Sequence, residues 1–324
     1  MKACSPKNKT LRLGVSSCLL GEKVRFDGGH KKNDFLIEGL SPYVEWVSIC
    51  PEVEVGLGIP RDALHLEERE GQARLIQTKN SQDLTKAMQV YARKKILELR
   101  SQNLSGYILK KNSPSCGMER VKIYSKDRKG IPQRKGQGLF ASALQIAFPS
   151  LPMEEEGRLA DPLLRENFVE RIFVYQRLQE LFHSKWIMSD LILFHTQHKL
   201  SLMAHSPEIY RVLGSLVGEG KSMPRKELQE LYQAKFMEAF KRLATPAKHA
   251  NVLLHVLGFF KRFLDSDSKQ ELLSFIEDYR KGLLPLIVPI TLVQHYVRRF
   301  KQDYLLQQSY LSPHPKELML RNRI

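Results

Sequence analysis

The chain has 324 residues, which is long for a single hydrophobic core and predicts two domains. Its hydrophobic content of 42% is ordinary for a globular protein, and no apolar stretch approaches the length of a membrane span, which argues against a membrane protein. Lysine and arginine number 51 against 35 aspartate and glutamate, a net charge of +16 that both halves share. This excess favours a polyanionic partner, although a basic surface also serves solubility.

The first half alternates strand-like and helix-like segments. Apolar runs predict strands at 11–20, 46–50, 73–78 and 107–111, the third of them at an edge, and helical periodicity predicts helices at 33–40, 81–103 and 138–147. Ser81 is a candidate N-cap of the long helix. This alternation is typical of an α/β fold with a mostly parallel, Rossmann-like sheet covered by helices.

The second half is predicted to be helical throughout. The proline-bounded segment 149–152 and the acidic run 154–156 indicate a domain boundary, which gives a flexible tail at 1–10, an α/β domain at 11–158 and an all-α domain at 159–324. Helix starts are indicated at Asp161-Pro162, Ser206-Pro207, Met223-Pro224, Thr245-Pro246 and the capping box Ser268-x-x-Glu271. An apolar stripe runs through Leu228, Leu231, Tyr232, Phe236, Ala239, Phe240 and Leu243.

Three of the four cysteines follow a strand and precede a turn. Cys18, Cys50 and Cys116 should therefore meet at the carboxyl edge of the sheet, where open α/β folds bind ligands. No secretory signal precedes them, so a cytoplasmic location with reduced thiols is expected and metal binding is favoured over disulfides. Three thiols would leave one metal atom open to substrate, because closed sites use four protein ligands.

Other interpretations of these cysteines remain. Buried cysteines often act as small apolar side chains, and a catalytic thiol would need a base, although no histidine is near them in sequence. Cys4 lies in a polar tail and is expected to be incidental.

The motifs around these cysteines resemble the thiouracil desulfurases of the TudS type. The matching segments are Ser17-Cys18-Leu19-Leu20-Gly21, Arg25-Phe26-Asp27-Gly28, Cys50-Pro51-Glu52, Gly56-Leu57-Gly58-Ile59-Pro60-Arg61 and Lys111-Asn112-Ser113-Pro114-Ser115-Cys116-Gly117. The resemblance implies a [4Fe–4S] cluster held by Cys18, Cys50 and Cys116, with the fourth iron not ligated by protein and free to bind the sulfur of a thiocarbonyl substrate.

Catalysis also needs a group that takes a proton from water. Glu52 is the candidate base, because it follows Cys50 closely and the family's Cys-Pro-Glu motif supports it. Ser115 could bond the substrate or relay a proton, or could be a turn residue, and Ser113 is a weaker claimant. Gly136-Gln-Gly138 could cradle a phosphate or simply start a helix. The expected reaction is hydrolytic and requires no nicotinamide or flavin.

The helical half resembles a second module, the YbgA-like domain, through Phe194-His195 to Lys199 and Met203-Ala204-His205. Proteins that combine both modules resemble desulfidases of 4-thiouridine in tRNA, so this resemblance implies tRNA as the partner and the helical domain as an RNA-binding module. Paired cations at 241–242, 261–262, 280–281 and 298–299 could contact phosphates or be solvated surface. The alternatives are a desulfurase of free thiouracil or thiolated nucleotides, and a non-catalytic cluster-bearing sensor or RNA-binding protein.

Overall fold

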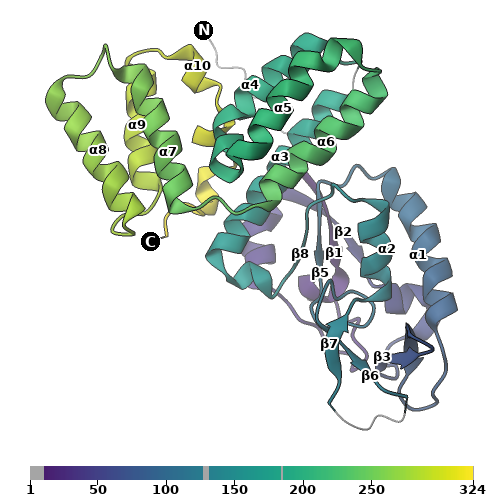
Figure 1. Cartoon of the computed structure of the whole chain (residues 1–324). Coiled ribbons are helices and arrows are strands. Elements are labelled where there is room, and N and C mark those ends of the chain that lie inside the picture. Colours follow the sequence, from purple (N-terminus) through teal and green to yellow (C-terminus); the bar gives the residue numbers. More distant parts are fainter. Residues whose placement is uncertain (1–10, 127–130, 184, 324) are drawn as a thin grey trace. The chain divides into compact units, whose positions relative to one another are not determined.

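The computed structural model describes residues 11–126, 131–183 and 185–323 (Figure 1). The chain divides into two compact units, Met1–Ala160 and Asp161–Ile324. Cys4 and the predicted tail lie outside the described residues. Among the described helices, none combines the length and the apolar character that a bilayer span requires.

A four-stranded parallel sheet forms the centre of the first unit. Its order is β2 (Val44–Ile49), β1 (Leu11–Ser16), β5 (Gly106–Leu109) and β8 (Met153–Glu155). Each neighbouring pair is parallel, which confirms the predicted α/β class. Gly14 in β1 lies against the ring of Tyr107 in β5, where a Cβ atom would collide with the ring.

A second, mixed sheet was not predicted. It has the order β4 (Gln72–Gln77), β3 (Leu64–Arg69), β6 (Val121–Tyr124) and β7 (Gln133–Gly136). Only β4 was expected, and it does lie at an edge. The β7 strand is exposed and polar except at Gly136, so it lacks the apolar alternation from which strands are predicted.

The first predicted strand and the long predicted helix are both shorter in the structure than the sequence predicted. The first strand ends at Ser16 and gives way to a 3₁₀ turn, Ser17–Leu20, rather than continuing to residue 20. Helix α1 spans Thr85–Arg100, and Ser81 does not cap it. Ser81 follows a turn and has a φ of +57°, whereas Asp83 Oδ1 accepts the hydrogen bond from the Thr85 amide at 2.9 Å. Helix α2 (Leu139–Ala147) and a π-helical turn, Phe35–Leu40, complete the unit's main helical segments.

The acidic run at 154–156, predicted to mark the domain boundary, lies a few residues before the division at Ala160 and begins within the last strand of the first unit. Glu154 and Glu155 belong to β8 and are buried. Glu154 Oε1 accepts a bond from Arg158 Nε at 2.7 Å, and Glu155 Oε1 accepts one from the Met118 amide at 2.7 Å. These donors allow carboxylates to sit in a buried strand.

Among the described residues, the second unit consists of helices joined by turns and short loops and has no strand. Its helices are α3 (Pro162–His183), α4 (Met188–His205), α5 (Pro207–Glu219), α6 (Arg225–Lys241), α7 (Pro246–Leu257), α8 (Ser266–Arg280), α9 (Ile287–Arg299) and α10 (Asp303–Leu306). Asp161, Ser206 and Thr245 accept bonds from first-turn amides, as predicted. Helix α8 instead begins after Asp265, which caps the Ser268 amide.

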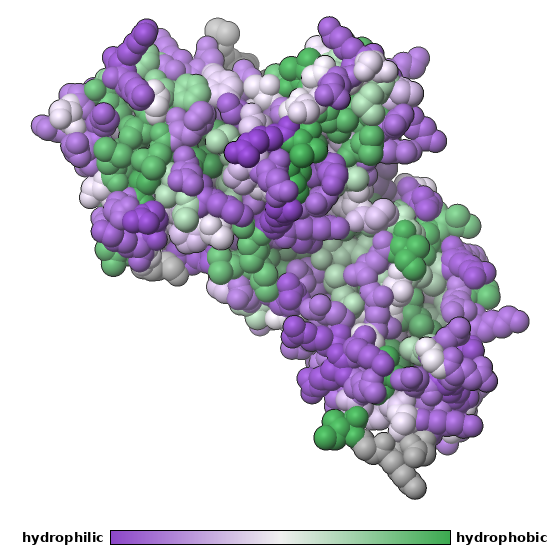
Figure 2. Space-filling view, in the orientation of Figure 1, coloured by the Kyte–Doolittle hydropathy of each residue, from purple (hydrophilic) through white to green (hydrophobic). Residues whose placement is uncertain are grey.

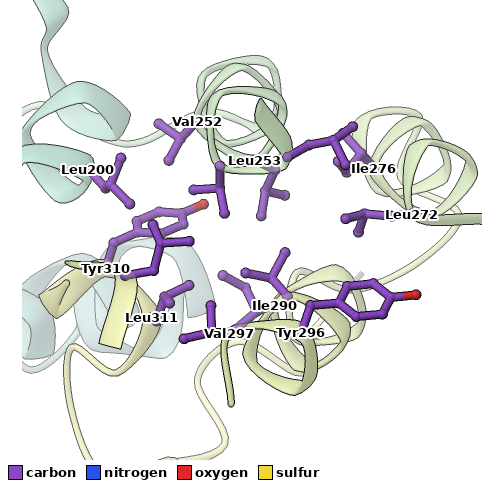
Figure 3. Close-up of a cluster of buried hydrophobic side chains, with 14 of the residues drawn as sticks. Leu200, Val252, Leu253, Leu272, Ile276, Ile290, Tyr296, Val297, Tyr310 and Leu311 are labelled. Carbon is purple, nitrogen blue, oxygen red and sulfur yellow. The ribbon is translucent and has the colours of Figure 1, made fainter. Parts of the chain in front are cut away.

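Apolar side chains from α4, α7, α8, α9 and the C-terminal segment form one core in this unit. Figure 3 shows several of them pointing toward one another between the helices. On the face seen in Figure 2, hydrophilic residues dominate and apolar patches lie over α7 to α9. In the stripe on α6, Leu228, Tyr232, Phe236, Ala239 and Phe240 are buried. Leu231 and Leu243 are exposed, so the stripe is narrower than predicted.

Candidate active site

Three adjacent strands of the parallel sheet each lead into a cysteine. Cys18 lies in the 3₁₀ turn after β1, Cys50 directly follows β2, and Cys116 lies in the loop after β5. These strands are neighbours in the order β2-β1-β5, so their carboxyl ends deliver the thiols to one edge. All three are free thiols.

The three cysteines line a single pocket of about 340 Å³. The other lining residues that carry chemistry are Glu52, Ser113, Asn112, Arg25, Lys31, Arg61, Lys110 and Lys111. Among the described lining residues there is no histidine and one carboxylate, Glu52. The pocket is therefore rich in thiols and cations.

Burial governs the protonation of the thiols. It raises the pKa of Cys18 to about 11, with Lys110 opposing the shift, and it raises the pKa values of Cys50 and Cys116 as well. The charge of Cys50 also raises the pKa of Cys18 and of Cys116, and the charge of Cys18 raises that of Cys116, as expected for three thiols around one pocket. Without a metal these thiols would be protonated, and no imidazole lines the described pocket to activate one as a nucleophile.

Glu52 is held in place by an arginine that the sequence did not single out for this task. Arg61 donates from Nη2 and Nε to Glu52 Oε2 at 2.7 and 3.1 Å, and the side chain of Arg61 is only 4% exposed. A third donor of Arg61, Nη1, binds the carbonyl of Val24 at 2.9 Å. The ion pair thus fixes one carboxylate oxygen and leaves Oε1 directed elsewhere.

The loop between Glu52 and Arg61 explains how the pair forms. Gly56 and Gly58 both have positive φ values, +97° and +71°, which favour glycine. They turn the chain back, and the Arg61 amide then bonds the carbonyl of Phe26 at 3.0 Å. Gly56 and Gly58 are the sequence signal that the chain turns back here. The ion pair joins residues nine positions apart, which no local sequence pattern predicts.

Ser113, rather than Ser115, meets Glu52. Ser113 Oγ donates to Glu52 Oε1 at 3.4 Å and accepts bonds from the amides of Ser115 and Cys116 at 3.2 and 3.0 Å. Ser115 is fully buried, does not line the pocket, and its Oγ has no hydrogen-bond partner. The geometry therefore favours the weaker claimant of the two serines.

The start of α2 supports the Cys116 loop. The amides of Leu139 and Phe140 bond the carbonyls of Pro114 and Ser115, and a Cβ atom on Gly138 would collide with the Ser115 backbone. These amides are used within the protein, so the glycines here serve the helix start rather than a phosphate cradle.

A single-ion metal site is not formed by these residues. Among the described residues, no group of three or more His, Cys, Asp or Glu side chains converges as one metal ion would require. An iron–sulfur cluster places its thiolate ligands on different iron atoms, so it does not need that convergence. In the second unit, His195 Nδ1 meets Tyr232 Oη at 3.2 Å and His198 Nδ1 meets the Phe194 carbonyl at 2.8 Å, both as structural hydrogen bonds.

The fold and the pocket define a class: an α/β domain that gathers three thiols and a carboxylate at the edge of a parallel sheet, joined to a helical domain. Comparison with known families agrees. The 2-thiouracil desulfurase family matches residues 13–156, and a family of unknown function, DUF1722, matches residues 199–315.

Curated proteins and a solved structure are also similar. The uncharacterised protein YbgA of Escherichia coli K12 is 31% identical over 153 residues, which cover 47% of this chain and 90% of that protein. The uncharacterised protein YbbK of Bacillus subtilis 168 is 33% identical over 109 residues, 32% of this chain and 71% of that protein. The structure of the [4Fe-4S]-dependent thiouracil desulfidase TudS is 28% identical and covers 47% of this chain and 94% of its own, with a TM-score of 0.38. This chain belongs to the family in which a 2-thiouracil desulfurase domain is joined to a YbgA-like DUF1722 domain.

Proposed function

We propose that this protein is a [4Fe–4S]-dependent desulfidase that converts a thiocarbonyl to a carbonyl and releases sulfide. The observation that carries the proposal is the pocket itself, where Cys18, Cys50 and Cys116 meet beside Glu52 in a domain of the 2-thiouracil desulfurase family. The donor set fits the cluster, because thiolates suit iron–sulfur centres and no further cysteine or histidine lines the described pocket. Three ligands would leave one iron open, and that iron would supply a Lewis acid for the substrate sulfur.

Glu52 would act as the base in this reaction. Water attacks the carbon of the C=S group, a C–O bond replaces the C–S bond, and the sulfur leaves as sulfide with no net change of oxidation state. Arg61 occupies Oε2 with two hydrogen bonds, whereas Oε1 accepts only the longer bond from Ser113. Oε1 is therefore the atom with room to accept a proton from water. Ser113 also accepts a hydrogen bond from the Cys116 amide, so it would fix the position of Glu52 relative to the loop that carries Cys116.

The pocket's charge supports a phosphate-bearing substrate, and we propose 4-thiouridine in tRNA. Five cationic residues line the pocket against one carboxylate among the described residues. Lys110 is engaged by Glu156 at 2.5 Å and Arg61 by Glu52, but no ion pair is found for Lys31 or Lys111 within the described part of the chain. A free thiolated base carries no phosphate that would use them, whereas a nucleotide within RNA does.

Free thiouracil is the second candidate, favoured by the description of the matching family. One experiment separates the two: reconstitute the full chain with iron and sulfide without oxygen, then assay it on thiolated tRNA and on free 4-thiouracil. Sulfide release from tRNA with a higher kcat/KM supports the proposal. Turnover of the free base alone would assign the second candidate, and a bound cluster with no turnover of either substrate would leave a sensor or RNA-binding role instead.

A further inference from the structure

A second cavity lies within the helical unit, between α9 and the C-terminal segment. Its volume is about 760 Å³. The charged residues among its lining are Arg298, Lys316, Glu317 and Arg321, with His314 beside them. Within the described residues, no ion pair links Arg298 or Lys316 to a carboxylate, so the lining carries an excess of positive charge.

Three arginines and one histidine at or near this cavity have buried nitrogen atoms with unused hydrogen-bonding capacity. Arg177 Nη1, His314 Nε2, Arg321 Nη2 and Arg323 Nε are all buried and have no partner. Two of these residues, Arg321 and His314, also line the cavity. Only 5% of the surface of Arg321 is exposed. Buried nitrogen atoms without partners are uncommon and costly, so four in one region call for an explanation.

The carboxylates nearby do not account for these atoms. Glu166 accepts from Arg321 Nε at 3.3 Å and from Arg323 Nη2 at 3.2 Å, and Glu170 faces His205 Nε2 at 3.3 Å. The remaining bonds of the arginines go to backbone carbonyls, from Arg321 Nη1 to Tyr310 and from Arg177 Nη2 to Pro313. Glu166 and Glu170 are thus both engaged, and the arginine nitrogens named above still have no acceptor.

The four atoms differ in what they need. The arginine nitrogens can only donate, and they suit an anion with several oxygen acceptors. The His314 ring is different, because Nδ1 lies 3.1 Å from the Pro315 carbonyl and so donates to it. Burial and the nearby charge of Arg321 lower the pKa of His314 to about 4. The ring is therefore neutral at pH 7, and Nε2 offers a lone pair that needs a donor.

Hydrogen phosphate satisfies both needs. Its charged oxygens accept from arginine, and its P–O–H group can donate to a neutral imidazole. A carboxylate or a sulfate has no such proton at neutral pH. We propose that the helical unit binds one phosphate group in this cavity, with Arg321 and His314 at the inner end and Arg298 and Lys316 nearer to solvent. This site stands independently of the reaction proposed for the first unit.

The first test is a calorimetric titration of the full chain with inorganic phosphate and, separately, with sulfate. Phosphate should bind saturably at one site, and sulfate, which has a similar shape, should bind more weakly. Absence of saturable phosphate binding at millimolar concentration would overturn the proposal and leave ordered water as the partner of the buried nitrogens. Equal binding of sulfate would overturn the assignment to phosphate.

Two neighbouring arginines provide the matched variants. Arg298 and Arg299 are both exposed on α9, but Arg298 lines the cavity whereas Arg299 lies over the Phe300 ring at 5.5 Å. Arg298→Ala should weaken phosphate binding by about tenfold, the lower end for loss of a hydrogen bond to a charged group. Arg299→Ala should leave it unchanged. Equal loss in both variants would show that general surface charge, rather than this cavity, attracts the anion.

The source of the phosphate can be assigned in the same assay. A short RNA with a 5′-terminal phosphate and the same RNA without it are each added as competitors of inorganic phosphate. Competition by the phosphorylated RNA alone assigns a terminal phosphate, and competition by both assigns the RNA backbone. Competition by neither assigns a free phosphate compound. His314→Asn, which keeps a polar side chain, should abolish the preference for phosphate over sulfate; an undiminished preference would contradict the role of His314.

Discussion

The two units use positive charge in different ways. In the first, cations surround a pocket that opens among thiols, and several are engaged by acids, as Arg61 is by Glu52 and Lys110 by Glu156. In the second, Arg321 is buried, and Arg177, Arg321 and Arg323 each have a buried nitrogen atom that donates no hydrogen bond. The comparison teaches that net charge alone does not locate function, because a paired cation positions a carboxylate whereas a buried cation without a full set of partners indicates a ligand.

The largest effect is expected from removing a thiol of the first unit. Cys50→Ser should abolish cluster binding and all desulfidase activity, because the serine hydroxyl is a far harder and more weakly acidic ligand for iron. Iron content and visible absorption after anaerobic reconstitution provide the measurement. Cys4→Ser is the matched control and should retain both. If Cys4→Ser loses iron as fully as Cys50→Ser, the three-ligand assignment is wrong.

Next in size is the effect of changing the base. Glu52→Gln keeps the shape of the side chain but cannot accept a proton, so kcat should fall by about 10²–10⁴-fold with the cluster retained. Ser115→Ala is the comparison, because Ser115 lies outside the pocket lining and should alter kcat far less than Ser113→Ala does. Near-wild-type turnover by Glu52→Gln would remove Glu52 from the mechanism.

The sequence predicted that the three cysteines lie at one edge of the sheet, but it did not predict the ion pair that holds Glu52. Cys18, Cys50 and Cys116 could be placed because buried strands are apolar and turns follow them, and both signals are local. The ion pair of Glu52 and Arg61 depends on a return loop whose path a local pattern does not specify.

The contrast between local and long-range interactions also explains which strands and helix starts the sequence predicted. The β7 strand is polar, and Glu154 and Glu155 in β8 are charged, so hydrophobic periodicity misses both strands. Hydrogen bonds from Arg158 to Glu154 and from the distant Met118 amide to Glu155 stabilise these acids in β8. Helix starts at Ser206 and Thr245 were predicted correctly, because an N-cap bonds residues only three positions away. Buried arginines such as Arg321 escape prediction, since charged residues near the end of a chain are typical of solvated surface.

A third prediction separates the roles of the units. A chain ending at Ala160 should keep activity on free 4-thiouracil, because the sheet, the thiols and Glu52 all lie within the first unit. It should lose most activity on thiolated tRNA if the helical unit supplies affinity for RNA. Full-length binding to tRNA should weaken steeply with salt, since phosphate contacts release counterions. A truncated chain that desulfurates tRNA as well as the full chain would assign the helices another role.

The smallest expected effect concerns the helical unit's response to acid. Burial lowers the pKa of His198 to about 3, whereas an unfolded histidine titrates near 6.5. The folded protein therefore binds fewer protons than the unfolded one between these values. Stability contributed by the neutral ring is complete above about pH 6.5 and falls as the pH drops toward 3, by at most about 1.4 kcal/mol per pH unit for one histidine.

His198→Phe tests this directly. The ring packs against Phe194 and Phe236, so phenylalanine should fit the same apolar site without titrating. The Phe194 carbonyl that His198 Nδ1 contacts lies one helical turn before it, so the α4 backbone itself can satisfy that oxygen. Denaturant unfolding at pH 7 and pH 4.5 should show a smaller loss of stability for the variant than for the native chain, whereas His30→Ala, at an exposed position, should match the native chain. An unchanged pH dependence in His198→Phe would mean that other buried groups, such as His249, set the acid sensitivity.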